Sequence, residues 1–461
     1  MMLLSAPAMA QTVLTVNIEP ATTWVRNFNP FNQTSARQST LDFIYEPLVV
    51  FNRFDNNKPN YRLAESFKLA DDLKSIEFKL RPDMKWSDGK PLTSADVKFT
   101  YDYLQKFPAL DFVSIWKFIS GVEVVDAQTV RFTLVNPSSL AADQLVQVPI
   151  IPEHVWKDIA DPVTFANENP VGSGPMTEIA RFTGQTYDQC RNPNYWDAKD
   201  LKIDCMRFPQ LADNNQILTA TANGTLDWGV SFLPDIENTY VAKDPKNFHY
   251  WYTPGSMVAF LFNLETANAN NRKAFNDVKF RRAVSMALDR KGMIDVAGYG
   301  YPTLNDDPSG MGELYKNWSD PSVLTDFGKY GKYDTDAAKA LLDEAGYVDK
   351  DGDGFRDNPD GTKLSFSLIV PNAWTDWIDT VQIAIEGMQA AGLDVKIATP
   401  EEAVWSGNLI NGNFDMAINS LPAAASPYYP YQRAYNEQDK GKTRFTAQRW
   451  FNPDLNKLLP F

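Results

Sequence analysis

The sequence predicts an α/β fold divided into two or three domains. Its 461 residues exceed what a single hydrophobic core usually organises. Stretches whose apolar residues recur at every second position stand beside stretches with helical spacing, so strands and helices are both expected. Apolar residues make up 44% of the chain, which is enough for ordinary globular cores and argues against disorder.

The stretch 76–104 organises the rest of the chain. Residues 76–80 alternate apolar and polar side chains, as in a half-buried strand, and turn-forming residues follow. Thr93 then precedes Asp96 in the spacing of a capping box, which predicts a helix reaching the end of the stretch. The stretch contains no nucleophile, metal cluster or phosphate loop, so we interpret it as architectural.

The same two patterns continue along the chain. Strands are predicted where apolar residues alternate with polar ones, at 13–16, 121–124, 130–134, 364–370 and 412–422. Helices are predicted from helical spacing or from capping residues, at 150–156, 217–224, 275–294, 333–346 and 374–391. The block 45–166 is expected to form a compact α+β insertion.

Three segments resemble a known family. LRPDMKWSDGKPLTSADVKFTYDYL (80–104) closely resembles the signature of family 5 extracytoplasmic solute-binding proteins, the peptide, nickel and oligosaccharide receptors of ABC importers. FNDVKFRRAVSMALDRKGMI (275–294) is a second close match, and PVGSGP (170–175) is similar to the crossing by which the family's chain returns to its first lobe. The resemblance implies a two-lobed periplasmic binding protein fold (type II, cluster C) with an extra α+β subdomain in lobe one.

The resemblance also implies a domain layout. Residues 11–44 and 167–262 would form lobe one, 45–166 its inserted subdomain, and 263–461 lobe two. In the family the C-terminal portion crosses back to complete lobe one. Here the sequence stops soon after FNPDLNKLL, so we expect that return to be truncated.

Composition and termini indicate an exported protein. MMLLSAPAMA (1–10) is typical of the end of a secretory signal peptide, with an A-x-A cleavage pattern. No lipobox-type cysteine follows, and no later run approaches the roughly 18 apolar residues of a membrane span. We expect a soluble, monomeric periplasmic protein that works with a membrane permease. The formal net charge of −14 disfavours nucleic acid or an anionic membrane surface as partner.

Two cysteines, Cys190 and Cys205, predict one disulfide that closes a short loop in an oxidising compartment. Two buried free thiols are the alternative. The spacing excludes a C-x-x-C redox motif.

The acidic segment 349–360 (DKDGDGFRDNPD) is the best metal candidate, because its spacing matches a calcium loop with a glycine at the turn. The candidate ligands are Asp349, Asp351, Asp353, Phe355, Asp357 and Asp360. The last stands where a bidentate Glu is usual, which predicts weak binding. A solvated acidic turn is the alternative, and no cofactor beyond this structural calcium is expected.

Catalysis finds little support. The chain has two histidines, His154 and His249, and neither an H-E-x-x-H nor a G-x-S-x-G motif. We therefore expect a binding protein and not an enzyme. A secreted carbohydrate-active enzyme remains an alternative, because acidic pairs are abundant.

Aromatic residues, at 13%, indicate the ligand chemistry. Sugar rings pack their C–H faces on tryptophan, and their hydroxyl groups bond to polar side chains. Aromatic residues at segment ends and two polar-contact candidates supply the predicted ligand-binding set: Trp24, Trp116, Trp228, Trp374, Trp377, Trp405, Asn419 and Tyr428. Of these, we expect Trp228 on lobe one and Trp374 on lobe two to stack on the ligand.

The segment 416–436 separates the two ligand hypotheses. The resemblance implies that peptide receptors hold the ligand's α-amino group with an Asp in this loop. Here the segment contains no Asp or Glu, and a buried ammonium without a counter-charge is costly. We therefore predict capture of a cello- or other β-linked oligosaccharide by hinge closure, with an oligopeptide as the alternative.

Overall fold

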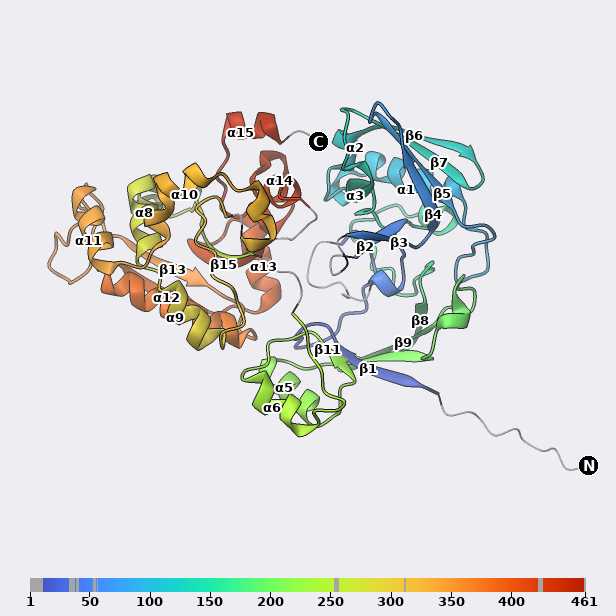
Figure 1. Ribbon diagram of the computed structural model, residues 1–461, viewed down its shortest axis with the longest axis horizontal. Coiled ribbons are helices and arrows are strands. Elements are labelled where there is room, and N and C mark those ends of the chain that lie inside the picture. Colours follow the sequence, from blue (N-terminus) through green and yellow to red (C-terminus); the bar gives the residue numbers. More distant parts are fainter. Residues whose placement is uncertain are drawn as a thin grey trace, which may run out of the picture. The chain divides into compact units, whose positions relative to one another are not determined.

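The computed structural model describes residues 11–32, 38, 41–52, 55, 57–252, 257–310, 312–421 and 426–459. The signal remnant predicted at 1–10 lies outside these residues. The chain divides into two compact units (Figure 1), of which the first joins Met1–Asn52 to Lys58–Ser231 and the second contains Phe232–Pro460. Of the helices described, none combines the length and the apolar character that crossing a membrane requires.

The first unit contains a five-stranded sheet in the order β11-β1-β10-β9-β8. Its strands are β1 (Val13–Asn17), β8 (Met176–Phe182), β9 (Thr186–Arg191), β10 (Cys205–Pro209) and β11 (Trp228–Gly229). Strand β1 runs parallel to both of its neighbours, and the β8–β9–β10 side is antiparallel.

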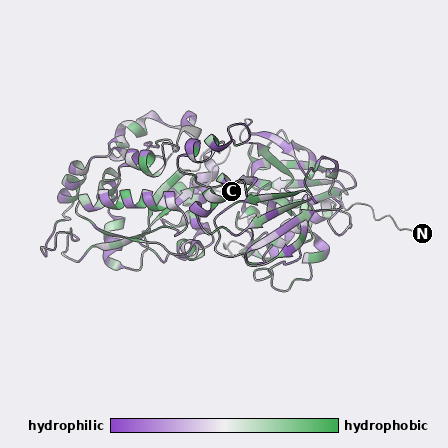
Figure 2. Cartoon of the chain, turned by 90° about the horizontal axis from the view of Figure 1, so that it is seen from below, coloured by the Kyte–Doolittle hydropathy of each residue, from purple (hydrophilic) through white to green (hydrophobic). Residues whose placement is uncertain are grey.

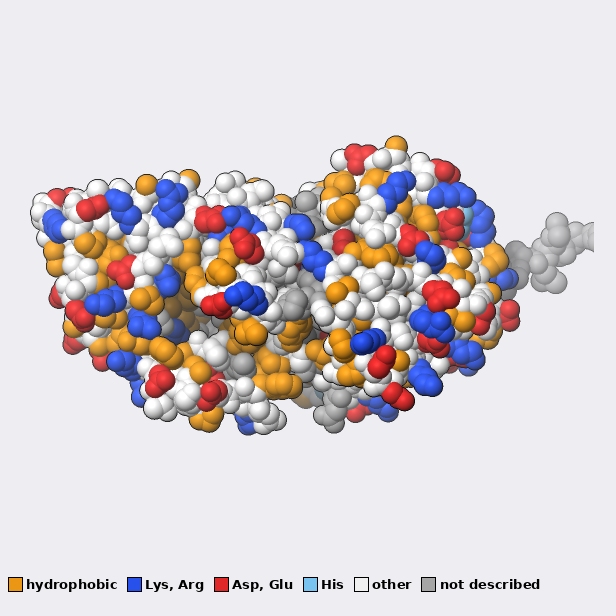
Figure 3. Space-filling model, turned by 90° about the horizontal axis from the view of Figure 1, so that it is seen from above, with side chains coloured by type: hydrophobic (Ala, Val, Ile, Leu, Met, Phe, Trp, Pro, Cys, Tyr) orange, Lys and Arg blue, Asp and Glu red, His pale blue; other side chains and the backbone are white. Residues whose placement is uncertain are grey.

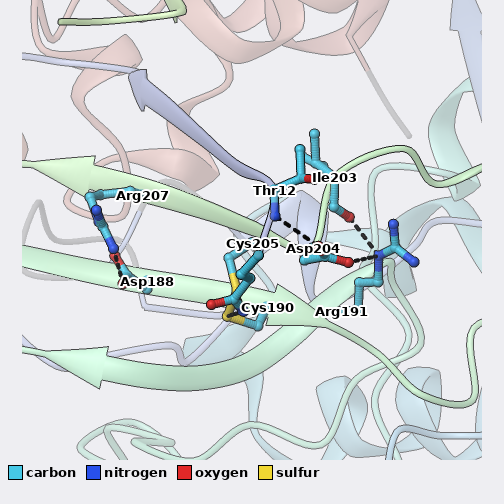
Figure 4. Close-up of a disulfide and its surroundings, with 9 residues drawn as sticks. Thr12, Asp188, Cys190, Arg191, Ile203, Asp204, Cys205 and Arg207 are labelled. Carbon is cyan, nitrogen blue, oxygen red and sulfur yellow. Dashed lines mark hydrogen bonds and ion pairs between the residues drawn. A yellow bond between two sulfur atoms is a disulfide. The ribbon is translucent and has the colours of Figure 1, made fainter. Parts of the chain in front are cut away.

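The predicted disulfide is confirmed. Cys190 on β9 stands directly opposite Cys205 on β10, and their sulfur atoms are bonded (Figure 4). The pair closes a loop over a sequence separation of 15. On the same two strands Arg207 donates two hydrogen bonds of 2.9 Å to Asp188. The two strands are therefore held together by a covalent bond and an ion pair as well as by their ladder.

The block 45–166 supplies the unit's antiparallel layer, in the order β4-β5-β7-β6. Its elements are β2 (Val49–Asn52), β3 (Lys58–Tyr61), β4 (Ala64–Leu69), β5 (Ser75–Leu80), α1 (Ser94–Lys106), α2 (Ile115–Phe118), β6 (Ile119–Asp126), β7 (Thr129–Leu134), α3 (Ala141–Leu145) and α4 (Glu153–Trp156). The predicted capping box is confirmed, since the side chains of Thr93 and Asp96 both accept from backbone N–H groups at the start of α1. Phe78 and Phe132 of this layer belong to the same hydrophobic cluster as Tyr187 of the other sheet.

The predicted glycine-rich junction lies against the entry of this block. Gly174 donates its N–H to the carbonyl of Ile44 at 2.8 Å, and Ser87 of the signature stretch donates its N–H to the carbonyl of Gly172 at 2.9 Å. A Cβ atom at Gly172 would stand 2.1 Å from the Ile44 carbonyl oxygen. The signature stretch therefore packs where the chain enters and leaves the block, as the architectural interpretation expects.

A buried carboxylate fixes the same junction. Glu46 is 1% exposed and accepts hydrogen bonds from three side chains, those of Arg62, Tyr195 and Trp196, the last two at 2.8 Å. Its own N–H bonds to the hydroxyl of Ser173. A buried charge of this kind is tolerated because it is paired and hydrogen-bonded on all sides.

The second unit is built on a four-stranded sheet in the order β12-β15-β13-β14. Strands and larger helices are β12 (Met257–Phe262), α7 (Ala269–Asn276), α8 (Val278–Met286), α10 (Pro321–Phe327), α11 (Thr335–Glu344), β13 (Ser365–Ile369), α12 (Thr375–Ala390), β14 (Asp394–Ala398), α13 (Glu402–Asn411), β15 (Met416–Leu421) and α14 (Tyr428–Tyr435). Figure 2 shows helices carrying both hydrophilic and hydrophobic residues, as expected for elements that cover a sheet.

Two boundaries differ from the sequence-based prediction. The helix expected at 275–294 is interrupted, because Asp277 caps a new helix by accepting from the N–H of Lys279. The unit boundary lies after Ser231, whereas the sequence places it after residue 262. The segment after Ser231 is hydrogen-bonded to the rest of the second unit, because the hydroxyl of Tyr301 donates to the carbonyl of Leu233.

Candidate ligand-binding site

Three of the predicted tryptophans meet in the second unit. Trp374 directly precedes α12, Trp377 lies in its first turn, and Trp405 lies in the first turn of α13. The ring centroids of Trp374 and Trp377 are 4.6 Å apart, and both rings lie within 6.1 Å of the ring of Trp405. We call these three residues the tryptophan cluster. Trp405 is fully buried within it, and the other two remain half-buried.

The topology explains why the cluster forms. Strands β14, β13 and β15 are parallel, and the chain passes from β13 through α12 to β14, then through α13 back across β13 to β15. Consecutive strand residues face opposite sides, so Leu368 packs into the core beneath α12 and Ile369 into the core beneath α13. The two helices start on opposite faces at the carboxyl edge of the sheet. Open α/β sheets bind ligands at such a switch point.

Polar groups border the cluster. Asn419 on β15 is 1% exposed, and its side-chain amide donates to the carbonyl of Arg444 at 2.9 Å. The guanidinium carbon of Arg444 lies 5.1 Å from the ring centroid of Trp405, within cation–π range. The predicted Asn419 is thus joined to the cluster, although its amide is already engaged by the backbone. Arg444 was missed, because nothing local distinguishes a single arginine in a polar segment.

Tyr428, another predicted ligand residue, starts α14 and is half-buried. Burial raises the pKa of its hydroxyl, which therefore stays protonated and can donate at neutral pH. The preceding residues 422–425 lie outside the described part of the chain. The position of Tyr428 on the acid-free segment keeps it a candidate for polar contact.

The three remaining predicted tryptophans belong to the first unit and are dispersed there. Trp24 is 8% exposed and packs edge-on against Tyr187, at 5.2 Å between ring centroids. Trp116 donates its indole N–H to the carbonyl of Tyr101 at 2.6 Å. Both rings are occupied by packing in this structure. Trp228, on the edge strand β11, keeps 39% of its surface exposed and is the one of the three with a large free face.

The predicted calcium loop brings part of its ligand set together. One carboxylate oxygen each from Asp349, Asp351 and Asp353 lies within 4.8 Å of the others, and all three residues are exposed. Asp360 points elsewhere, to Lys273 and Thr362, and the hydrogen bond from Lys273 lowers the pKa of Asp360. Asp357 is buried and accepts from the N–H of Lys350, and Phe355 donates its N–H to the carboxylate of Asp353. The residues present therefore fit half of a calcium loop.

The second unit also has a surface hollow of about 610 Å³, lined by Glu265, Lys440 and Arg449 among others. Two of its charged side chains are paired with each other, Lys440 with Glu265 at 2.5 Å. The buried guanidinium of Arg449 donates to the carbonyls of Leu409 and Ile410 at the end of α13. This is the usual stabilisation of a helix C-terminus by a cation, so the hollow is less suited to a ligand than the tryptophan cluster.

The surface carries both signs of charge. Figure 3 shows Lys and Arg side chains interspersed with Asp and Glu over the visible face of each unit. Nucleic-acid interfaces require clustered positive charge, and the described residues on the face visible in Figure 3 form no such cluster.

Comparison with known proteins agrees with this geometry. The family model for bacterial extracellular solute-binding proteins, family 5 Middle, matches residues 58–442. A putative binding protein of Brucella abortus is 26% identical over 84% of this chain and 68% of its own length. The mannohexaose-bound periplasmic oligopeptide-binding protein of Thermotoga maritima is 25% identical, with a TM-score of 0.88 over 98% of this chain and 85% of that one.

The oligopeptide-binding protein AppA of Bacillus subtilis, solved with a nonapeptide, shares the fold at 22% identity, with a TM-score of 0.80 over 97% of this chain and 86% of that one. The two-lobed type II binding-protein fold predicted from the sequence is therefore confirmed. With more than half of its length matched, the chain belongs to family 5 of the bacterial extracellular solute-binding proteins.

Proposed function

We propose that this family 5 protein is the periplasmic receptor of an ABC importer and that its cargo is an uncharged oligosaccharide, cello-linked or otherwise β-linked. The observation that carries the proposal is the tryptophan cluster at the carboxyl edge of the second unit's sheet. Flat indole faces suit the C–H faces of pyranose rings, and neighbouring amide and phenol groups suit their hydroxyls.

The acid-free segment 416–436 supports a neutral ligand. A peptide's ammonium would find no counter-charge on that segment, which is unfavourable in a partly desolvated site. Acidic residues near the cluster stand at the helix starts, with Asp376 in the first turn of α12 and Glu402 in that of α13. The similarity to a protein solved with mannohexaose supports the same ligand class. An oligopeptide held mainly through its backbone is the second candidate, and AppA, solved with a nonapeptide, has the same fold.

Capture requires no chemical step. A ligand that contacts both units stabilises the closed arrangement by its differential affinity for that arrangement, and release to the permease reverses the equilibrium. Trp374 and Trp377 would stack on the sugar from the second unit and Trp228 from the first. Tyr428 would orient its hydroxyl groups, and Asn419, whose amide is bonded to the backbone at both ends, would help to hold the loop that carries Arg444.

Calorimetric titration tests the ligand class, with cellohexaose and mannohexaose in one arm and tripeptides in the other. Trp374→Ala should weaken saccharide binding about 10- to 100-fold, because it removes one stacking face. Trp318→Ala is the matched control, since that indole is 64% exposed elsewhere in the second unit. Binding of tripeptides and no saccharide would overturn the proposal. Consumption of the sugar during the titration would favour the enzyme alternative.

We further propose that the loop at 349–353 binds a structural calcium ion weakly. Three converging carboxylates repel one another unless a cation joins them, and Lys363 pairs with only one of them, Asp353. Calcium should raise the thermal midpoint of the parent protein but not that of Asp351→Asn. Asp336→Asn, in the first turn of α11, serves as the control. A parent protein that retains no calcium in native mass spectrometry would contradict this proposal.

A further inference from the structure

A second group of aromatic side chains lies in the second unit, outside the predicted site. It consists of Phe232, Tyr250, Tyr252, Tyr299 and Tyr301, and we call it the aromatic platform. Tyr252 is 54% exposed and Tyr299 is 48% exposed. Large exposed aromatic patches are uncommon on proteins without a binding partner, because burying such rings is strongly favourable.

The rings form a continuous row. Phe232, Tyr299 and Tyr301 are mutual neighbours, with ring centroids 5.9–6.2 Å apart. Tyr252 continues the row at 5.6 Å from Tyr301, and Tyr250 follows at 5.5 Å from Tyr252. The planes of Tyr299 and Tyr301 differ by 29° and those of Tyr252 and Tyr301 by 37°. The plane of Tyr301 is therefore tilted by less than 40° from the planes of Tyr252 and Tyr299.

Hydrogen bonds hold the row in place. The hydroxyl of Tyr301 donates to the carbonyl of Leu233 at 3.0 Å and accepts from the N–H of Ile236 at 2.8 Å. The hydroxyl of Tyr250 donates to the Glu237 carboxylate at 2.7 Å. Tyr250 and Tyr301 are therefore fixed before any ligand arrives, which lowers the ordering cost of binding to these two rings.

Tyr299 stands just after a helix end. Its φ is +51°, the left-handed conformation that is common at that position, and the N–H of Gly300 closes the helix end by donating to the carbonyl of Ile294 at 2.8 Å. The helix end therefore fixes the backbone that carries the ring, and nearly half of the ring's surface stays open.

Both segments that carry the platform lead to the edge of the sheet at which β15 ends. Tyr252 precedes the start of β12 at Met257 by five residues, a reach of at most about 17 Å. Met257 pairs with Leu421, two residues beyond Asn419 on β15. The loop after Tyr301 returns to the same place, since the amide of Asn305 contacts the Met257 sulfur at 3.2 Å.

We propose that the aromatic platform stacks on outer sugar rings of a neutral oligosaccharide, as an extension of the ligand site. The inference rests on the proposed function. Bordering charges define the occupant: Asp235 and Glu237 would repel an anionic saccharide, and both already bond to protein groups. An ammonium ligand would be attracted by tyrosine faces and carboxylates alike, so the test below includes an aromatic tripeptide as the competing occupant.

The test compares hexasaccharide with disaccharide binding by calorimetry. Tyr252→Ala and Tyr299→Asn should each weaken cellohexaose or mannohexaose about tenfold and leave the disaccharide unchanged. Asn tolerates the left-handed conformation, so Tyr299→Asn removes the ring without adding backbone strain. Tyr333→Ala is the matched control, because that ring is 49% exposed away from the row. Thermal unfolding checks that every variant folds.

The outcomes separate the two proposals. Hexasaccharide binding that is equal in the parent and in both platform variants would overturn the platform alone. A parent that binds no saccharide of either length would overturn the proposed function and the platform with it. Weakened binding of an aromatic tripeptide with unchanged hexasaccharide binding would also overturn the platform.

Discussion

Gly172→Ala tests whether close backbone packing at the junction, where the chain enters and leaves the block 45–166, stabilises the first unit. The added Cβ would stand 2.1 Å from the carbonyl oxygen of Ile44 and 2.6 Å from its Cγ2. Attractive contact between carbon atoms needs about 3.5–4.0 Å. No rotamer change relieves a clash with a backbone oxygen, so one of the two crossing strands of chain must move.

The expected cost follows from what that movement breaks. Overpacking of a close contact costs about 1–3 kcal/mol. The shift also strains two hydrogen bonds, from Ser87 to Gly172 at 2.9 Å and from Gly174 to Ile44 at 2.8 Å. Each contributes about 1 kcal/mol, so the free energy of unfolding of the first unit should fall by about 2–5 kcal/mol. This corresponds to a lowering of its thermal midpoint by roughly 5–15 °C.

Gly121→Ala provides the matched control, because a Cβ there meets nothing within 4 Å. That variant should be neutral or stabilised by up to about 1 kcal/mol through loss of unfolded-state freedom. Urea unfolding of both variants, followed by circular dichroism, measures the difference. Equal midpoints for the two variants would refute the role assigned to the junction.

Three further predictions concern stability. Glu46→Gln should cost about 2–3 kcal/mol in urea unfolding, because it weakens the charge-assisted hydrogen bonds that the buried carboxylate accepts, among them that of Arg62, whose side chain is 27% exposed. Glu123→Gln, at an exposed ion pair, should cost less than about 1 kcal/mol, and similar losses for the two variants would contradict the burial argument. Cys190→Ser should destabilise the first unit by about 3 kcal/mol, because the disulfide closes a loop over a sequence separation of 15. A parent protein whose unfolding midpoint is the same with and without a reducing agent would contradict this. Lys273 lowers the pKa of Asp360, so the stability that this pair contributes is present above about pH 4 and is lost as the pH falls further. The thermal midpoint of Lys273→Met should therefore fall less steeply below about pH 4 than that of the parent protein. An equally steep fall in both would count against this prediction.

Local patterns predicted the elements that local chemistry determines. The strand at 76–80, the capped helix that follows and the strand and helix at 364–391 appear as β5, α1, β13 and α12. In each, apolar periodicity, a capping residue or both settle the structure within one short stretch. The failure at 275–294 has the same cause, since Asp277 can continue a helix or cap a new one, and periodicity alone does not choose.

Long-range contacts lay beyond the sequence. The carboxylate of Glu46 meets Tyr195 across 149 positions, and Arg444 reaches Trp405 from a different loop. Of the six predicted tryptophans, Trp374, Trp377 and Trp405 converge because the βα crossovers bring helix starts to one edge of the sheet. The aromatic run at 250–252 is visible in the sequence, but its neighbours Tyr299 and Tyr301 come from a second segment that only the fold brings beside it.

The parts of the chain that reveal the family and the parts that would choose the ligand obey different constraints. Ser87 and the junction glycines are fixed by backbone contacts in the first unit, where one added carbon atom disrupts the crossing. The tryptophan cluster and the platform lie at loop and helix starts, where a ring can be exchanged without moving a strand. One fold can therefore serve proteins solved with mannohexaose and with a nonapeptide, and the ligand must be argued from side chains such as Arg444 and Tyr299.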